Sequence, residues 1–393
     1  MAQDNNLYAK YYIETDDDLT EVGNGLAEIE TTGKWGGFDT PPTELFKSCG
    51  GELFEVQELE KGKGFLTLAL PMKNFDMENS AFSSLWLYMI GGATHALIAY
   101  NKSRLVDFWF DEAYNKYFTG PKWGIDGVKK YLGVPESEPV IGTIVKPTSG
   151  LTADEIADMC KRFALGGLQF IKDDEKFMNT PHCPLSERVE KVMAEIKKAE
   201  DKTGKKVLYT PHITTGPENI LKYGEIAMKA GARGLMVNIF ASSFSSVKML
   251  RDAFDVPIYA HCGGKEAFGR AEGQGVSPEV VAKLARLMGA EFFRSNILGG
   301  YLVGGTTEEI DSLIHTMRKP MKGINDMVPA LSGGLSPKNL GENLSAFGTG
   351  IMALAGTGIT QYPGGIAKGV EAMKAVAADY AANAANTAKK GGR

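Results

Sequence analysis

From residue 139 onward, short apolar runs alternate with amphipathic stretches of helical spacing. A short apolar run bounded by turn residues favours a buried strand, and each run here is followed by a polar or Gly-rich loop. We count eight such strand–loop–helix units over roughly 255 residues. The predicted strands are 140–145, 168–171, 206–209, 234–237, 257–260, 291–294, 327–331 and 351–354.

The helices between these strands carry start signals. Thr152 and Glu155 have the spacing of a capping box, and Ser277 and Thr307 each place a hydroxyl before first-turn acids. Pro337 is predicted at a first helical position. The predicted helices begin near 152, 185, 217, 244, 277, 307, 337 and 364. Eight regular units favour a (β/α)₈ barrel over a doubly wound open sheet, which seldom has so many.

The first part of the chain has a less regular pattern. Strand-like alternation covers 8–13, 52–59 and 64–70, and helical spacing covers 19–30 and 79–93. Strands and helices without strict alternation indicate an α+β domain, of ferredoxin-like type. We therefore expect an N-terminal α+β domain over residues 1–135 and a barrel over residues 136–393.

Composition narrows the functional class. The 393 residues include 43 Lys+Arg and 48 Asp+Glu, and a net charge of −5 gives no basic surface for nucleic acid. No apolar run approaches the roughly 18 residues that span a bilayer, and the first residues lack the apolar core of a signal peptide. The four scattered cysteines are typical of reduced thiols, so we expect a cytoplasmic protein without a membrane or nucleic-acid partner.

Reactive side chains follow several predicted strands. In a barrel these positions meet at one rim, where barrel active sites lie. Lys146, the run Lys172–Glu175, His212, His261 and Arg294 all fall there. The acidic run has two interpretations: a solvated turn before a helix, or a magnesium site, since Mg²⁺ prefers carboxylate oxygens. Each histidine is equally open to a packed, structural role or a catalytic one.

Two glycine loops follow the last two strands, at Ser332–Gly334 and Gly356–Gly358. Ordinary turns favour glycine too. However, backbone N–H groups approach an anion closely only where side chains are missing, and these two loops form the usual phosphate site of barrels. We favour the phosphate interpretation.

The segment Gly166-Gly-Leu-Gln-Phe-Ile-Lys-Asp-Asp-Glu175 resembles the magnesium signature of ribulose bisphosphate carboxylase (RuBisCO) and its RuBisCO-like relatives. Gly142–Pro147 resembles the family's first-strand lysine motif, and Gly120–Gly127 its interdomain segment. The two glycine loops resemble its phosphate loops, and Thr32-Gly-Lys-Trp35 its N-terminal motif. The resemblance extends over most of the chain.

The resemblance implies a role for each matching residue. Lys172 would take up carbon dioxide as a carbamate and bind Mg²⁺ together with Asp174 and Glu175. Lys146 would lie near the enolising carbons of the substrate and His261 near its oxygens. His212 is a further catalytic candidate because of its strand-end position. The residues implied to hold substrate hydroxyl and phosphate are Ser332, Gly333, Gly334, Gly356 and Thr357, and we add Arg294 as a partial replacement for a phosphate-site arginine that this chain lacks. The family forms head-to-tail dimers, so Thr32 and Trp35 would reach into a partner subunit's site, in a homodimer or an assembly of dimers.

The departures from the family pattern bear on the reaction. The loop after the sixth strand, Asn296–Val303, lacks the lysine that a carboxylase carries there. Thr148 replaces a second lysine, and Cys262 replaces an arginine of the second phosphate site. Gly92 stands where carboxylases have asparagine and where the methionine-salvage enolase has a lysine base. His212 stands where relatives usually have asparagine.

These residues favour a RuBisCO-like protein of the non-carboxylating type IV. It would form a Mg²⁺-stabilised enediolate or enolate from a small, phosphorylated, sugar-derived ketone or keto acid. The outcome would be tautomerisation, isomerisation or decarboxylation, which share this intermediate. Two alternatives stay open at this point: an unusual ribulose-bisphosphate carboxylase, and a non-catalytic regulatory protein that keeps the fold.

Overall fold

The computed structural model describes residues 5–36 and 39–391. The chain divides into two compact units. One contains the residues up to Phe118 together with 264–284 and 321–324, and the other contains 119–263, 285–320 and the residues from 325 on. Within the described ranges, every helix is too short or too polar to cross a membrane.

The first unit is built on a five-stranded sheet with the order β10-β4-β1-β3-β2. β1 pairs antiparallel with both β3 and β4, and the short β10 joins β4 in parallel. The strands are β1 (Asn6–Glu14), β2 (Glu52–Glu60), β3 (Lys63–Pro71), β4 (Lys102–Phe110) and β10 (Gly275–Val276). The helices are α1 (Leu19–Ile29), α2 (Glu44–Cys49), η1 (Met72–Asn74), α3 (Met77–Trp86), η2 (Leu87–Gly91), η3 (Glu112–Tyr117) and α10 (Lys265–Gly269).

The expected α+β character of this unit is confirmed, with two omissions. β4 has the alternating burial of a half-buried strand, yet no strand was predicted over Lys102–Phe110. The short, exposed α2 was also missed. The helix predicted over 79–93 is shorter, because α3 ends at Trp86 and continues as the π-helical turn η2.

The second unit contains the eight-stranded parallel barrel that the sequence pattern predicts. Its strand order is β7-β6-β5-β13-β12-β11-β9-β8. A parallel bridge between His212 and Met236 joins the segment after β7 to β8, which closes the sheet on itself. The strands are β5 (Val140–Ile144), β6 (Phe170–Lys172), β7 (Leu208–Thr210), β8 (Leu235–Asn238), β9 (Ile258–His261), β11 (Phe292–Ser295), β12 (Val328–Leu331) and β13 (Met352–Leu354).

Apolar side chains fill the barrel, as in other packed barrel interiors. Phe170 and Phe292 pack with ring centroids 5.2 Å apart, and Tyr259 lies 5.9 Å from Phe292. All three are almost completely buried. This rigid core fixes the ends of the strands from which the site residues project.

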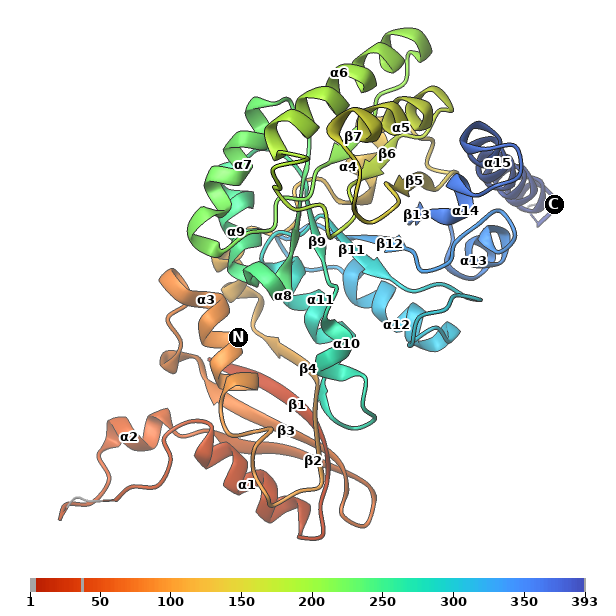
Figure 1. Ribbon diagram of the computed structural model, residues 1–393. Helices are drawn as coiled ribbons and strands as arrows, with labels where there is room; N and C mark the ends of the chain where they lie inside the picture. The colour runs from red at the N-terminus through yellow and green to blue at the C-terminus, as the bar shows by residue number, and fades with distance from the viewer. Residues whose placement is uncertain (1–4, 37–38, 392–393) are drawn as a thin grey trace. The chain divides into compact units, whose positions relative to one another are not determined.

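Helices surround these strands (Figure 1). They are α4 (Gly124–Leu132), α5 (Ala153–Leu165), α6 (Leu185–Thr203), η4 (Pro217–Asn219), α7 (Ile220–Lys229), α8 (Ile239–Ser242), α9 (Phe244–Ala253), α12 (Thr307–Arg318), α13 (Leu340–Phe347), α14 (Thr357–Thr360) and α15 (Ile366–Gly391), with α11 (Pro278–Leu287) spanning both units.

The predicted helix starts are mostly correct, with two corrections. The capping box at Thr152 and Glu155 is present. The cap of α12 is Thr306 rather than Thr307, because Thr306 lies three residues before Glu309 and both capping-box bonds form. Pro337 lies in a turn, and α13 begins only at Leu340.

Removing the cap of α5 should destabilise the barrel unit measurably. Thr152→Ala deletes the hydroxyl that accepts from the Glu155 backbone N–H. We expect a loss of about 1 kcal/mol in the free energy of unfolding, measured by urea denaturation. Thr316→Ala is the matched control, since Thr316 lies inside α12 and bonds back to the Ser312 carbonyl. An equal loss in both variants would contradict a capping role.

Candidate active site

Lys172 ends β6 and lies inside the barrel mouth. Its side chain is fully buried, its Nζ donates to the Asp173 carbonyl at 3.0 Å, and its Nζ lies 5.4 Å from the centre of the Tyr259 ring. Burial lowers the pKa of this ammonium to about 8, against the opposing attraction of Glu175 and Asp174. More of the amine is therefore neutral near pH 7 than in an ordinary lysine.

Lys146 follows β5 and pairs with an acid from β6. Its ammonium forms an ion pair with the buried carboxylate of Asp174. The Lys146 side chain is about one-third exposed, so it lies at the opening rather than in the core. A carbon placed on Gly356 would lie 3.7 Å from Lys146 Cγ, which brings the loop after β13 beside this lysine.

Glu175 and His261 meet across the same mouth. Glu175 Oε2 lies 3.5 Å from His261 Nε2. His261 Nδ1 accepts from the Gly263 N–H at 3.2 Å and faces the Asn238 amide nitrogen at 3.5 Å. The Asn238 oxygen already accepts from the first N–H groups of α8, which fixes its amide as the donor. Two donors at Nδ1 place the proton of a neutral His261 on Nε2, facing Glu175.

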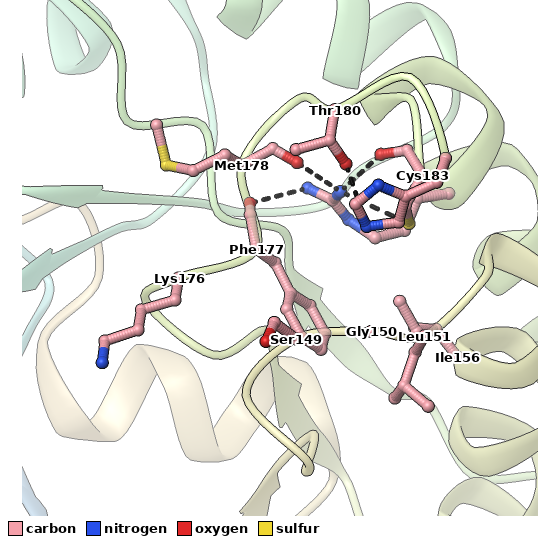
Figure 2. A pocket seen from close by; sticks show the side chains of 11 residues that line it. Ser149, Gly150, Leu151, Ile156, Lys176, Phe177, Met178, Thr180 and Cys183 are labelled. Atoms are coloured by element: carbon pink, nitrogen blue, oxygen red, sulfur yellow. Dashed lines mark hydrogen bonds between the residues drawn. The ribbon is translucent and has the colours of Figure 1, made fainter.

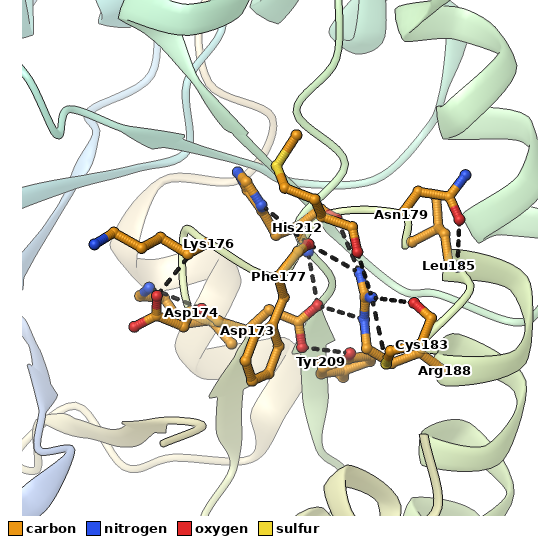
Figure 3. A network of polar contacts seen from close by, with 12 residues as sticks. Asp173, Asp174, Lys176, Phe177, Asn179, Cys183, Leu185, Arg188, Tyr209 and His212 are labelled. Carbon is orange, nitrogen blue, oxygen red and sulfur yellow. Dashed lines mark hydrogen bonds and ion pairs between the residues drawn. The ribbon is translucent and has the colours of Figure 1, made fainter. Parts of the chain in front are cut away.

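Asp173 points away from the opening and anchors a buried polar network (Figure 3). Its carboxylate pairs with Arg188 Nε at 3.0 Å and accepts from the Tyr209 hydroxyl at 2.6 Å and the His212 backbone N–H at 3.0 Å. Asp173 and Arg188 are both fully buried. The Arg188 guanidinium also donates to the carbonyls of Phe177, Met178, Cys183 and His212. The network ties the loop after β6 to β7.

His212 belongs to this network more than to the opening. Its Nδ1 faces the Phe177 carbonyl at 3.3 Å, and its Nε2 forms a short hydrogen bond with the Thr214 hydroxyl. Burial lowers the pKa of His212 to about 4. A neutral imidazole held at both nitrogens is suited to positioning the segment after β7.

The depressed pKa of His212 predicts a pH dependence of stability. The unfolded state takes up this proton near pH 6.5 and the folded state only near pH 4. The stability contributed by neutral His212 is therefore present above pH 6.5 and is lost as the pH falls toward 4, by about 3 kcal/mol at most. Thermal unfolding of wild type and His212→Asn at several pH values should show a weaker acid sensitivity in the variant. Parallel pH profiles would contradict this expectation.

The loop after β12 requires glycine. Gly333 and Gly334 have φ of +106° and +109°, a region that side chains disfavour. A carbon on Gly333 would lie 2.6 Å from the Leu302 side chain, and one on Gly334 would lie 3.0 Å from the Tyr301 ring. The loop after β11 therefore packs beside these glycines, although Gly334 stays exposed. Asn296 holds that loop in place by donating to the carbonyls of Val303 and Gly304 at 2.5 and 2.8 Å.

The remaining predicted residues divide between the units. Arg294 lies on β11, and its carbonyl accepts a weak bond at 4.0 Å from the buried Cys262 thiol, so the two residues are neighbours. The backbone N–H of Ser332 donates a hydrogen bond to the Ser295 carbonyl, which holds Ser332 in place. Thr32 and Trp35 lie in the other unit, where Trp35 Nε1 donates to the Thr40 carbonyl.

A cavity of about 60 Å³ lies next to the Arg188 network, lined by Ser149–Leu151 and parts of the loop after β6 (Figure 2). Substrate pockets usually enclose several hundred Å³, so this cavity has room for one or two waters only. None of the predicted site residues lines it. It belongs to the structural support of the loop.

The donors at the mouth fit a hard cation if Lys172 is modified. Within residues 5–36 and 39–391, no group of three His, Cys, Asp or Glu side chains is arranged to hold a metal ion. Asp174 and Glu175 offer carboxylate oxygens, and a carbamate on Lys172 would add further oxygens beside them. Carbamate formation requires a neutral amine, which the lowered pKa of Lys172 favours. The set then has the all-oxygen chemistry that Mg²⁺ prefers.

Sequence reasoning missed Arg188 and Tyr209 and gave Asp173 no role. The signal was present, because successive strand residues point to opposite faces and three consecutive acids cannot all face the opening. A buried acid turned away from a site needs a cationic or hydrogen-bonding partner.

Comparison with known proteins gives matches over almost the full length. The family model "Ribulose bisphosphate carboxylase large chain, catalytic domain" matches residues 124–390, and the corresponding N-terminal domain model matches residues 1–114. A 3-oxo-isoapionate-4-phosphate decarboxylase of Rhizobium etli is 28% identical over 93% of this chain and 90% of its own length.

Two solved structures are similar over nearly the whole chain. The octameric ribulose-1,5-bisphosphate carboxylase/oxygenase of Pyrococcus horikoshii has a TM-score of 0.88 at 25% identity, covering 97% of this chain and 89% of that one. A rubisco-like protein from Burkholderia fungorum has a TM-score of 0.86 at 26% identity, covering 95% and 94%. Carboxylating and non-carboxylating proteins are thus both similar to this chain.

Proposed function

The chain belongs to the ribulose bisphosphate carboxylase large-chain family, and we propose that it is a RuBisCO-like, Mg²⁺-dependent enzyme that forms an enolate without fixing carbon dioxide. Its substrate is a small phosphorylated ketone or keto acid. The observation that carries the proposal is the grouping of Lys146 with Asp174 and of Glu175 with His261 around the buried Lys172. The loop after β11 contains no lysine between Asn296 and Val303.

The proposed metal site consists of Asp174, Glu175 and carbamylated Lys172. A Mg²⁺ ion held there supplies a Lewis acid that neutralises negative charge developing on substrate oxygens. His261 orients Glu175 through its Nε2 proton. Asp173, clamped by Arg188, fixes the backbone that carries these ligands.

Lys146 is the proposed proton carrier. Its Nζ lies at the mouth and is held by Asp174, so it can present a proton to an enolate oxygen or carbon, or remove one after losing its own. The loop after β11 lies against the glycine loop after β12, with Leu302 half-buried and Tyr301 exposed.

The proposed phosphate cradle is formed by the two glycine loops. Gly333, Gly334 and Gly356 have no side chains that would keep an anion from their backbone N–H groups, and Ser332, Thr357 and Arg294 would add side-chain donors. Because Cys262 replaces an arginine of the second phosphate site, we propose one phosphate rather than two. In a homodimer, Thr32 and Trp35 of a second copy would complete the site; a similar carboxylase is octameric.

Decarboxylation is the favoured net reaction, because one relative acts on a phosphorylated 3-oxo acid. Loss of carbon dioxide from such an acid leaves its electron pair on the enolate, which then takes up one proton. The rate of carbon dioxide release from a panel of phosphorylated 3-oxo acids, with Mg²⁺ present, tests this. Fixation of radiolabelled carbon dioxide on ribulose bisphosphate would overturn the proposal in favour of a carboxylase.

A further inference from the structure

Two lysine side chains approach Gly167, at the end of the barrel opposite to the candidate active site. Gly167 joins α5 to β6, and a carbon placed on it would lie 2.8 Å from Lys374 Nζ and 3.5 Å from Lys205 Nζ. Lys205 lies three residues before β7, and Lys374 lies on α15. Gly167 has φ of +92°, so this position is built for glycine and leaves the space to the two ammonium groups.

The two ammonium groups carry like charge, and Lys374 is half-buried whereas Lys205 is exposed. Among the described residues, neither has a carboxylate within ion-pairing distance, and Lys374 Nζ finds only the Gly167 carbonyl at 3.5 Å. Burial and the neighbouring Lys205 lower the pKa of Lys374 to about 8, while Glu138 opposes this weakly. The arrangement costs free energy as long as no anion joins it.

A helix-capping role explains only half of this arrangement. Lysines often interact with carbonyls at the end of a helix, and Lys374 does so just after α5. However, the partial negative charge of a helix end amounts to about half a unit. One lysine more than balances it, so capping gives no reason for Lys205 to approach as well.

We propose that Lys205 and Lys374 form a binding site for a phosphate dianion, either free phosphate or a phosphomonoester, at the end of the barrel remote from the catalytic residues. A dianion matches two ammonium groups in charge. Because Gly167 has no side chain, none stands between the dianion and the two nitrogens. Bound there, it bridges α15 to the strand ends of β6 and β7.

Lysine-resolved acetylation tests the site in the intact protein. Trace labelling with acetic anhydride at pH 8, read out by mass spectrometry for each lysine, reports the neutral fraction of each amine. Inorganic phosphate should reduce labelling of Lys374 by about 10-fold or more, because a bound dianion restores an ordinary lysine pKa. Lys202, exposed on the last turn of α6, should be unaffected, and sodium chloride of equal ionic strength serves as the salt control.

The variants separate this site from the catalytic phosphate cradle. In Lys205→Met, phosphate should no longer protect Lys374, whereas labelling of Lys146 should respond as in wild type. Protection by glycerol phosphate as well as phosphate assigns the site to phosphomonoesters, and protection by inorganic phosphate alone assigns it to the free ion. If phosphate protects Lys374 no better than chloride, or equally well in Lys205→Met, the proposal is wrong.

Discussion

Lys172→Met should abolish Mg²⁺ binding at the barrel mouth and lower enolate formation by ~1,000-fold or more. Methionine fills nearly the same buried volume but cannot form a carbamate, so Asp174 and Glu175 lose the oxygens beside them. The variant also removes a buried cation whose burial is costly, so the fold should persist. Calorimetric titration with Mg²⁺ in the presence of bicarbonate measures the loss directly. With ¹³C-bicarbonate, the wild type should show a carbamate resonance that the variant lacks.

The matched control is Lys176→Met, four residues along the same loop. The Lys176 side chain is exposed, and only its backbone N–H contacts Asp174, which the substitution keeps. Its Mg²⁺ affinity and carbamate resonance should equal those of the wild type. Unchanged Mg²⁺ binding in Lys172→Met would show that Lys172 is not a ligand of the metal.

Arg188→Met should be the most destabilising single change away from the metal ligands. It leaves the Asp173 carboxylate buried without its cation, and it leaves the carbonyls of Phe177 and His212 without the donor they share. Breaking a buried ion pair by removing one partner typically costs about 3–5 kcal/mol. We expect a loss of that size in urea-induced unfolding followed by tryptophan fluorescence and circular dichroism.

Arg162→Met provides the comparison for Arg188→Met. Arg162 pairs with Asp158 on the exposed face of α5, where both side chains are more than half exposed. Such surface pairs contribute less than about 1 kcal/mol. A loss in Arg188→Met as small as that in Arg162→Met would contradict the central role given to the Asp173–Arg188 pair.

The periodic pattern predicted the barrel well, because each buried strand is short, apolar and followed by a polar loop. Every predicted barrel strand overlaps an observed one, with ends within two residues. The pattern failed where burial is weak or interrupted. The strand Lys102–Phe110 carries charges on its exposed face, and the turn at Pro337 resembles a helix start in local sequence only.

The chemistry of the site was less accessible from sequence. Strand ends indicated which residues gather at the rim, but not which way each side chain turns. Asp173 faces Arg188, which lies 15 residues along the chain, and His212 is held by Phe177 and Thr214. These partners come from different loops, so their pairing depends on three-dimensional packing that no local motif encodes.

The most direct test of Mg²⁺-dependent enolate formation is proton exchange in deuterated water. Wild-type protein would be incubated with phosphorylated ketoses and 3-oxo acids, with Mg²⁺ or with a chelator, and deuterium uptake beside the carbonyl followed by NMR and mass spectrometry. The account predicts uptake, or release of carbon dioxide followed by uptake, for at least one compound with Mg²⁺ and none with the chelator. Exchange at the same rate in wild type and Lys172→Met, or no exchange with any compound, would contradict it.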